Sequence, residues 1–184
     1  GGPVAVPSQD MVLGIYYLTQ ERPGSIGEGH YFKNLNEAIL AYENGYVKLH
    51  SRIHVRVTKK MPDGTEKTGT VESTLGRFIF NEILPQDLGF VDRSKPENDL
   101  LLEVDFHVGK KGLKQILEKV INIHGATTTA EVLDDIKAMG YKYSTRAAMT
   151  VSISDMTVPE KKPALIKQAQ DTVDLITKNY KHGL

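Results

Sequence analysis

Residues 47–57 restrict the fold most, because apolar and polar side chains alternate along them. The apolar members are Val47, Leu49, Ile53, Val55 and Val57, and the polar members are Lys48, His50, Arg52, His54 and Arg56. A period of two is typical of a β-strand that buries one face. Residues 62–64 form a Pro-Asp-Gly turn, so residues 67–73 should return as the antiparallel partner. The sequence predicts a hairpin with one buried and one basic face.

Three capping residues predict helices around this hairpin. Ser8 can cap a helix that extends to about residue 18, Asn34 one that ends at Asn44-Gly45, and Thr74 one that stops before Pro85. The first of these helices is apolar around most of its circumference, so we expect it to be buried.

The segments between these elements have different compositions. Residues 22–29 are rich in glycine and proline and indicate a surface loop, and residues 86–99 indicate a polar connection. The apolar run 100–108 is short, and we expect it to form another strand.

After residue 111 the pattern becomes mainly helical. Helices are expected over 113–124, ending at Gly125, and over 128–139, ending at Gly140, and the two should form a hairpin. Residues 149–154 alternate again and predict a short strand. Pro159 then occupies the favoured first position of a last helix.

The last helix carries apolar residues at alternating spacings of three and four. They are Ile166, Ala169, Val173, Ile176 and Tyr180. This heptad seam needs a second helix to cover it, yet the sequence ends at Leu184. We therefore expect the chain to be a piece of a longer polypeptide.

Together these patterns predict an α+β fold. A small antiparallel β-sheet packed with helices extends to about residue 108, and a mainly helical part follows that ends in one arm of an antiparallel coiled coil. We expect two units, residues 1–157 and residues 158–184.

Composition excludes several classes of function. The chain has 184 residues, 23 Lys and Arg against 23 Asp and Glu, and no Cys. The absence of cysteine excludes disulfide scaffolds, thiolate zinc sites, iron–sulfur clusters and cysteine nucleophiles. Balanced charge argues against a free-standing polybasic nucleic-acid binder. The longest apolar run, residues 11–18, is too short to span a bilayer, so we expect a soluble globular chain.

The basic strand face is the first candidate for chemistry. His50 and His54 are four residues apart, but on a strand this spacing covers about 13 Å, which is too far to hold one metal ion. A solvated basic face is the favoured interpretation. Contact with phosphate through Arg52, Arg56, Lys59 and Lys60 is the alternative, although no aromatic residue interleaves with them to stack bases.

Arg146 is the most interesting lone charge outside that strand. It could form an ion pair with Asp134, Asp135 or Asp155, or it could line a passage for phosphates. The sequence contains no nucleophile elbow, no His-Glu-x-x-His motif and no Asp-rich metal loop. We therefore expect no self-sufficient active site in this chain.

Six ordered strings resemble bacterial RNA polymerase β′ subunits. The first covers residues 3–19, which read PVAVPSQDMVLGIYYLT and are similar to the segment that follows the catalytic magnesium loop of that family. The others are Gly27-Glu-Gly29 and the strings at residues 38–45, 74–85, 140–146 and 158–162. The resemblance covers essentially the whole chain.

The resemblance implies the pore region of β′, domain 3, followed by the first helix on the rim of the secondary channel. Through that channel nucleotides enter and the 3′ end of a backtracked transcript leaves. Gre-type cleavage factors and other channel-binding regulators would dock on residues 158–184. The implied docking residues are Lys161, Lys162, Ile166, Val173, Ile176 and Tyr180.

The resemblance also implies roles for five other residues. Ser8, Gln9, Asp10 and Arg146 match positions close to the channel and the active centre, and Asp134 aligns with an aspartate beside a regulatory guanosine-tetraphosphate pocket. Gln9 and Asp10 also have a simpler interpretation as first-turn partners of a helix dipole. The sequence departs from the family at Ala138, where some members have tyrosine, and at Ala148 and Ser154.

The implied partners are the other polymerase subunits (β, α and the remainder of β′), the DNA template and the RNA transcript, in a bacterial cytoplasm. The aspartates that bind magnesium in the family lie outside this chain, so we expect no cofactor or metal here and no activity of the chain alone. The alternative function is an autonomous interaction module that binds protein or nucleic acid through its basic strand and last helix.

Overall fold

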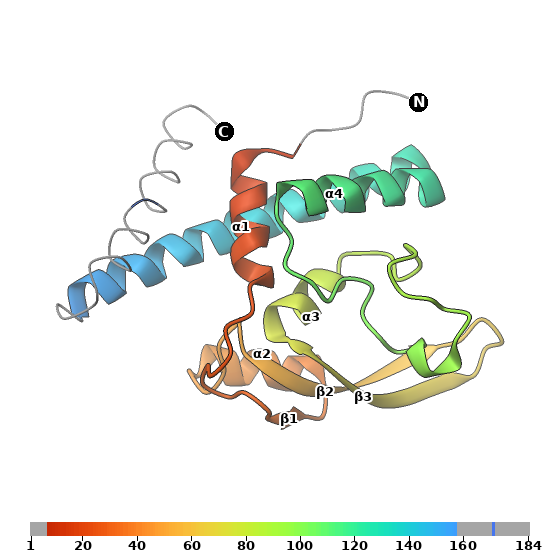
Figure 1. The fold of residues 1–184 in the computed structure, drawn as a ribbon, viewed down its shortest axis with the longest axis horizontal. Helices are drawn as coiled ribbons and strands as arrows, with labels where there is room; N and C mark the ends of the chain where they lie inside the picture. The colour runs from red at the N-terminus through yellow and green to blue at the C-terminus, as the bar shows by residue number, and fades with distance from the viewer. Residues whose placement is uncertain (1–6, 158–170, 172–184) are drawn as a thin grey trace.

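The fold is described by a computed structural model, which covers residues 7–157 and residue 171. The elements follow the order α1 (Gln9–Thr19), β1 (Tyr31–Phe32), α2 (Leu35–Glu43), β2 (Arg52–Lys60), β3 (Glu66–Thr74), α3 (Leu75–Asn81), a 3-10 turn (Pro96–Asn98) and α4 (Lys110–Thr157). In Figure 1 the sheet lies at the lower edge of the molecule, α4 extends across its upper half, and α1 crosses α4. The expected α+β class is confirmed for these residues.

The three expected helix caps are all present. The side chain of Ser8 accepts a hydrogen bond from the Met11 amide at 3.4 Å, that of Asn34 from the Glu37 amide at 2.8 Å, and that of Thr74 from the Arg77 amide at 3.2 Å. Each satisfies an amide that the first turn of a helix leaves unpaired. Helices α1, α2 and α3 therefore start where local chemistry predicts.

The expected hairpin is confirmed, but the sheet is mixed. β2 and β3 pair antiparallel from Arg52 opposite Thr74 to Lys60 opposite Glu66. The two-residue strand β1 adds a parallel neighbour to β2, which the sequence did not predict, with Tyr31 opposite His54. The strand also starts at Arg52, because residues 47–51 instead form a turn that hydrogen-bonds to Ile26.

The second half of the chain differs more from the sequence-based prediction. Gly125, with φ at +84°, ends the first part of α4, and the chain reverses there as expected (Figure 1). Gly140 does not end a helix, since α4 continues through it to Thr157. The strand expected over 149–154 is wrong, because these residues are helical, and Met149 and Ile153 are each 59% exposed on the same face.

Close backbone contacts hold α1 in place. A Cβ atom on Gly14 would lie 2.0 Å from the carbonyl oxygen of Gly140, and one on Gly76 would lie 1.8 Å from the carbonyl oxygen of Leu18. Glycine at both positions lets α1 approach α4 and α3 more closely than any side chain would allow. As a result Ile15 and Leu18 are completely buried.

The apolar run 100–108 is not a strand, so that prediction is wrong. At Glu103 and Val104 its backbone is hydrogen-bonded to side chains instead of to a sheet neighbour. The amide group of Asn81 accepts a hydrogen bond from the Val104 amide at 3.0 Å and donates one to the Val104 carbonyl at 2.8 Å, and Gln86 accepts one from the Glu103 amide at 3.0 Å. Irregular chain therefore packs against α3 without losing its hydrogen bonds.

A buried arginine ties the same loop to α1. Arg77 is 6% exposed and donates to the carbonyl of Thr19 at 2.9 Å and to the carboxylates of Glu21 and Asp105, each at 3.2 Å. Arg52 contacts both carboxylates at 3.1 Å from the sheet side. A buried guanidinium is tolerated only when its donors are paired, and this network pairs them.

His50 connects the turn before β2 to α1. Its Nε2 atom lies 2.8 Å from the carbonyl oxygen of Tyr17, and its ring packs edge-on against the Tyr17 ring. Burial lowers the pKa of His50 from 6.5 to about 4. The ring is therefore neutral near pH 7, and Nε2 carries the proton that it donates to Tyr17.

We predict that Gly14→Ala and Gly76→Ala each destabilise the chain by about 2 kcal/mol or more, because the new methyl group would collide with backbone atoms. Urea unfolding of the 184-residue chain measures this. The matched control is Gly112→Ala in the first turn of α4, where the nearest atom is 3.7 Å away. That change should be neutral or stabilising, and an equal loss in all three variants would contradict the close-contact explanation.

We predict a second, pH-dependent loss of stability from His50. Between pH 6.5 and about 4 the unfolded chain binds a proton that folded His50 does not, so the free energy of unfolding should fall as the pH falls. The full loss is at most about 3.5 kcal/mol, at about 1.4 kcal/mol per pH unit.

The measurement is urea unfolding of the 184-residue chain between these pH values. His50→Gln keeps a donor for Tyr17 and cannot titrate, so its stability should vary less with pH than that of the unmodified chain. The control His54→Gln removes a half-exposed ring and should leave the slope unchanged. Identical slopes for the His50 variant and the unmodified chain would show that His50 is not responsible.

Candidate functional site

The Ser-Gln-Asp string lies at the N-terminal end of α1. Ser8 caps the helix, Gln9 is exposed and Asp10 is 9% exposed. The backbone of Asp10 lies beside Gly140 of α4. The crossing of α1 over α4 therefore fixes where these three residues sit.

Asp10 has an unusual environment for a carboxylate. Its Oδ1 atom is buried, and within residues 7–157 no group donates a hydrogen bond to it. Its place in the first turn of α1 is favourable for a negative charge, because the helix dipole is positive there. The position of Asp10 is compatible with both interpretations from the sequence, which are a partner of the helix dipole and a polar residue in a channel wall.

Arg146 lies where α4 meets α2. Its Nη1 atom donates a hydrogen bond to the hydroxyl of Tyr42 at 2.9 Å, and the guanidinium lies 5.5 Å from the centre of the Tyr42 ring. Among the described side chains, which include Asp134 and Asp135 but not Asp155, no carboxylate forms an ion pair with Arg146. The sequence missed Tyr42, because the two residues are far apart along the chain.

Two further tyrosines lie near this contact. Tyr17 from α1 and Tyr143 from α4 both lie within electrostatic reach of Tyr42 and Arg146, and burial raises the pKa of both hydroxyls. The hydrogen bond with Tyr42 raises the pKa of Arg146, so the guanidinium keeps its charge. One half-buried cation is therefore hydrogen-bonded to Tyr42 of α2 and lies near tyrosines of α1 and α4.

The other predicted site residues are not brought into this cluster. Asp134 is exposed on α4. The docking residues expected in the last helix, from Lys161 to Tyr180, lie outside the described residues, as do the expected heptad seam and all of the expected second unit except residue 171.

The two histidines of the basic strand are separated by their partners. His50 contacts Tyr17, whereas His54 stacks on Tyr31 of β1, with ring centroids 4.1 Å apart and planes 7° apart. Within residues 7–157, His, Asp and Glu side chains form no group of three or more that could hold a metal ion. None of the helices in that range has both the length and the apolar character needed to cross a bilayer.

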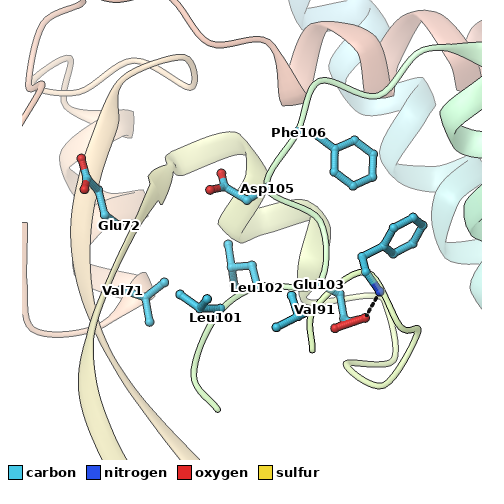
Figure 2. Close-up of a pocket in the computed structure, with 9 residues that line it drawn as sticks. Val71, Glu72, Val91, Leu101, Leu102, Glu103, Asp105 and Phe106 are labelled. Atoms are coloured by element: carbon cyan, nitrogen blue, oxygen red, sulfur yellow. Dashed lines mark hydrogen bonds between the residues drawn. The ribbon is translucent and has the colours of Figure 1, made fainter. Parts of the chain in front are cut away.

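A pocket of about 310 Å³ lies between β3 and the loop that follows α3 (Figure 2). Its lining residues are Val71, Glu72, Phe90, Val91, Leu101, Leu102, Glu103, Asp105 and Phe106. Glu103 accepts hydrogen bonds from the Phe90 amide and from Arg93, and Asp105 accepts them from Ser73 and Arg77. These internal bonds occupy the carboxylates of Glu103 and Asp105, Glu72 forms an ion pair with Arg52 at 3.4 Å, and the residues predicted from the sequence lie elsewhere.

Comparison with known proteins accounts for the six ordered strings that resemble β′ subunits. Residues 1–156 match the family model described as RNA polymerase Rpb1, domain 3. The chain is also similar along all 184 residues to curated proteins named DNA-directed RNA polymerase subunit beta′.

These relatives come from several bacteria. Identity is 70% with the protein of Lachnoclostridium phytofermentans, 56% with that of Acetivibrio thermocellus and 52% with that of Clostridium perfringens. The chain spans 15% of the length of the first protein and 16% of the other two. The resemblance to β′ subunits is confirmed, and the chain belongs to the RNA polymerase Rpb1, domain 3 family.

Proposed function

We propose that the chain is the part of a β′ subunit that forms the wall of the secondary channel in a multisubunit DNA-directed RNA polymerase. The observation that carries this proposal is the match to Rpb1 domain 3 over residues 1–156. The 70% identity to a curated β′ subunit along all 184 residues agrees with it. The whole enzyme would transfer nucleotides onto RNA, with magnesium held by residues outside this chain. This chain would shape the passage for the nucleotides.

A channel wall needs polar groups on rigid supports, because a mobile group would not define a path. Helix α1 meets this requirement, since Gly14 allows backbone contact with Gly140 of α4. The Ser8-Gln9-Asp10 end of α1 would therefore keep a constant position at the channel. Its helix dipole would favour negative groups of a passing nucleotide.

Arg146 would supply a fixed positive charge to the same passage. A guanidinium has five N–H donors, and within residues 7–157 only Tyr42 is hydrogen-bonded to the Arg146 side chain. The remaining donors could contact the phosphates of a nucleotide or the backbone of an extruded transcript. Because Tyr42 holds the guanidinium in place, the Arg146 side chain would lose little conformational freedom when it contacts each passing substrate.

Residues 158–184 would form the first helix of the channel rim. Their heptad seam would pack against a second helix in the longer polypeptide, and cleavage factors of the Gre type would dock on the rim that the two helices form. Asp134 would lie near a regulatory guanosine-tetraphosphate pocket. This part of the proposal rests on the sequence and on the similarity to β′ subunits.

The alternative function is an interaction module that works on its own through the basic strand and the last helix. The 70% identity along the entire chain to part of a β′ subunit favours the channel role instead. If the module acts on its own, polymerase reconstituted without this region should still use nucleotides normally. That outcome would favour the alternative.

We predict that Arg146→Ala in reconstituted polymerase raises the apparent KM for nucleotides by about three- to tenfold, because one exposed charge contact contributes roughly 1 kcal/mol. Steady-state elongation on a defined template measures this. Cleavage of backtracked RNA should slow as well, since the transcript uses the same passage.

Three further variants separate charge from position in this test. Arg146→Lys keeps the charge and should recover part of the effect, whereas Tyr42→Phe removes only the hydroxyl and should cause a smaller change. The matched control Lys114→Ala removes an exposed charge from the first part of α4 and should change nothing. An unchanged KM together with unchanged cleavage in Arg146→Ala would reject Arg146 as a channel residue.

We predict that charge reversal at Lys161 and Lys162 in reconstituted polymerase lowers cleavage stimulated by a Gre-type factor at least about fivefold, because like charges directly opposed at an interface are costly. Factor titration of cleavage by a stalled complex measures this. Elongation without the factor should be unaffected, and Lys114→Glu should leave both activities unchanged. A factor response identical to that of the unmodified enzyme would remove these lysines from the docking surface.

A further inference from the structure

The outer face of the sheet is a surface that the core does not use. Along β2 and β3 every second side chain points away from the helices and is exposed or half-buried, whereas Ile53, Val55 and Val71 face inward and are at most 3% exposed. In Figure 1 this sheet forms the edge of the molecule opposite α4. We call this surface the outer face. Its members are Tyr31, His54, Arg56, Thr58, Lys60, Glu66, Thr68, Thr70 and Glu72.

Two aromatic rings are stacked on the outer face. Tyr31 is 71% exposed, yet its ring lies nearly parallel to that of His54, with a centroid separation of 4.1 Å and an interplanar angle of 7°. An exposed tyrosine on a short edge strand would otherwise move among several rotamers. Stacking holds the ring flat, so that another planar group could pack on it with little loss of side-chain entropy.

Arg56 supplies a positive charge beside the rings. It is exposed and directly follows His54 on the outward row of β2. Within the described part of the chain no carboxylate forms an ion pair with Arg56, whereas Glu72 is paired with Arg52 at 3.4 Å and Glu66 lies opposite Lys60. Arg56 and Lys60 balance Glu66 and Glu72 in formal charge, and Arg56 is a cation of this face that has no ion pair among the described residues.

Hydroxyl groups complete the surface toward the end of the hairpin. Thr58 and Thr68 are hydrogen-bonded to each other at 2.9 Å, and Thr70 lies opposite Arg56. A threonine hydroxyl can donate to a phosphate oxygen and accept from a sugar hydroxyl. The outer face thus presents stacked rings, one free guanidinium and polar groups in a row along two strands.

We propose that the outer face binds single-stranded nucleic acid, with an unpaired base stacked on Tyr31 and the adjoining phosphate on Arg56. Flat sheets with exposed aromatic and basic side chains bind unpaired bases by stacking and the backbone by charge. An acidic protein segment would use the charge of Arg56 but would gain nothing from a fixed planar pair. The stacked rings therefore favour nucleic acid over an acidic peptide.

This site is distinct from the channel proposal. It uses β1, β2 and β3, whereas the channel residues lie on α1 and α4. The sequence pointed to the basic half of this surface but showed no aromatic residue within the strand to stack bases. The parallel strand β1 brings Tyr31 to that place.

The test measures binding of fluorescein-labelled decamers to the 184-residue chain by fluorescence anisotropy at about 50 and about 200 mM KCl. We expect the uridylate decamer to bind, and Tyr31→Ala to weaken it at least fivefold, about the loss expected for one stacked base. Tyr31→Phe should bind normally, because the ring and not the hydroxyl makes the stack. Arg56→Gln should lower the salt slope of log affinity by about 0.7, the value for one phosphate contact on a single strand.

Matched controls separate this site from general surface effects. Tyr46→Ala removes another tyrosine that is 67% exposed, and Lys114→Gln removes another exposed charge, so neither should change the affinity. A duplex of the same length should bind at least about tenfold more weakly, since its bases are already stacked on one another. Thermal unfolding checks that the Tyr31 variants remain folded.

Three results would each overturn the proposal. One is the lack of binding to the uridylate decamer up to about 1 mM chain, well above ordinary non-specific dissociation constants. Another is an equal effect of Tyr31→Ala and Tyr46→Ala. The third is equal affinity for a labelled glutamate decamer, which would indicate an acidic protein partner instead. None of these outcomes depends on the nucleotide KM of Arg146→Ala polymerase, so the two proposals can fail separately.

Discussion

Backbone contact at helix α1 is the constraint on which the rest of the structure depends. The helical part of the chain, α4, packs mainly against α1, and α1 also packs against α3, which follows directly from the sheet. Both contacts require glycine, at Gly14 with Gly140 and at Gly76 beside Leu18. Because helix α1 joins the two parts, any shift in its packing would move the Ser8–Asp10 end relative to Arg146.

Features encoded by neighbouring residues could be predicted from the sequence. The caps at Ser8, Asn34 and Thr74, the turn at residues 62–64 and the reversal at Gly125 all occur as expected. Each depends on a side chain or a positive φ that acts within about four residues. The buried face of the hairpin was predictable for the same reason, since a period of two needs no knowledge of the partner.

Features that depend on distant partners could not be predicted. Gly140 has the composition of a helix end, but its role is to admit α1, which lies more than a hundred residues earlier in the chain. The run 100–108 has the composition of a strand, but Asn81 and Gln86 take the place of a neighbouring strand. Residues 149–154 show that six residues are too few to distinguish a period of two from a helix that continues from the preceding turn.

The candidate sites follow the same division. Ordered strings pointed to Arg146 and the Ser8–Asp10 end as candidates, but they could not show that Tyr42 holds the arginine or that Tyr31 stacks on His54. This hydrogen bond could be mistaken for proof that Arg146 is merely structural. The bond is no such proof, because a guanidinium that donates one of its five N–H groups to Tyr42 keeps its full charge and loses only its freedom to move. A positioning contact of this kind is what a channel wall requires, since a charge must be fixed before it can guide a ligand.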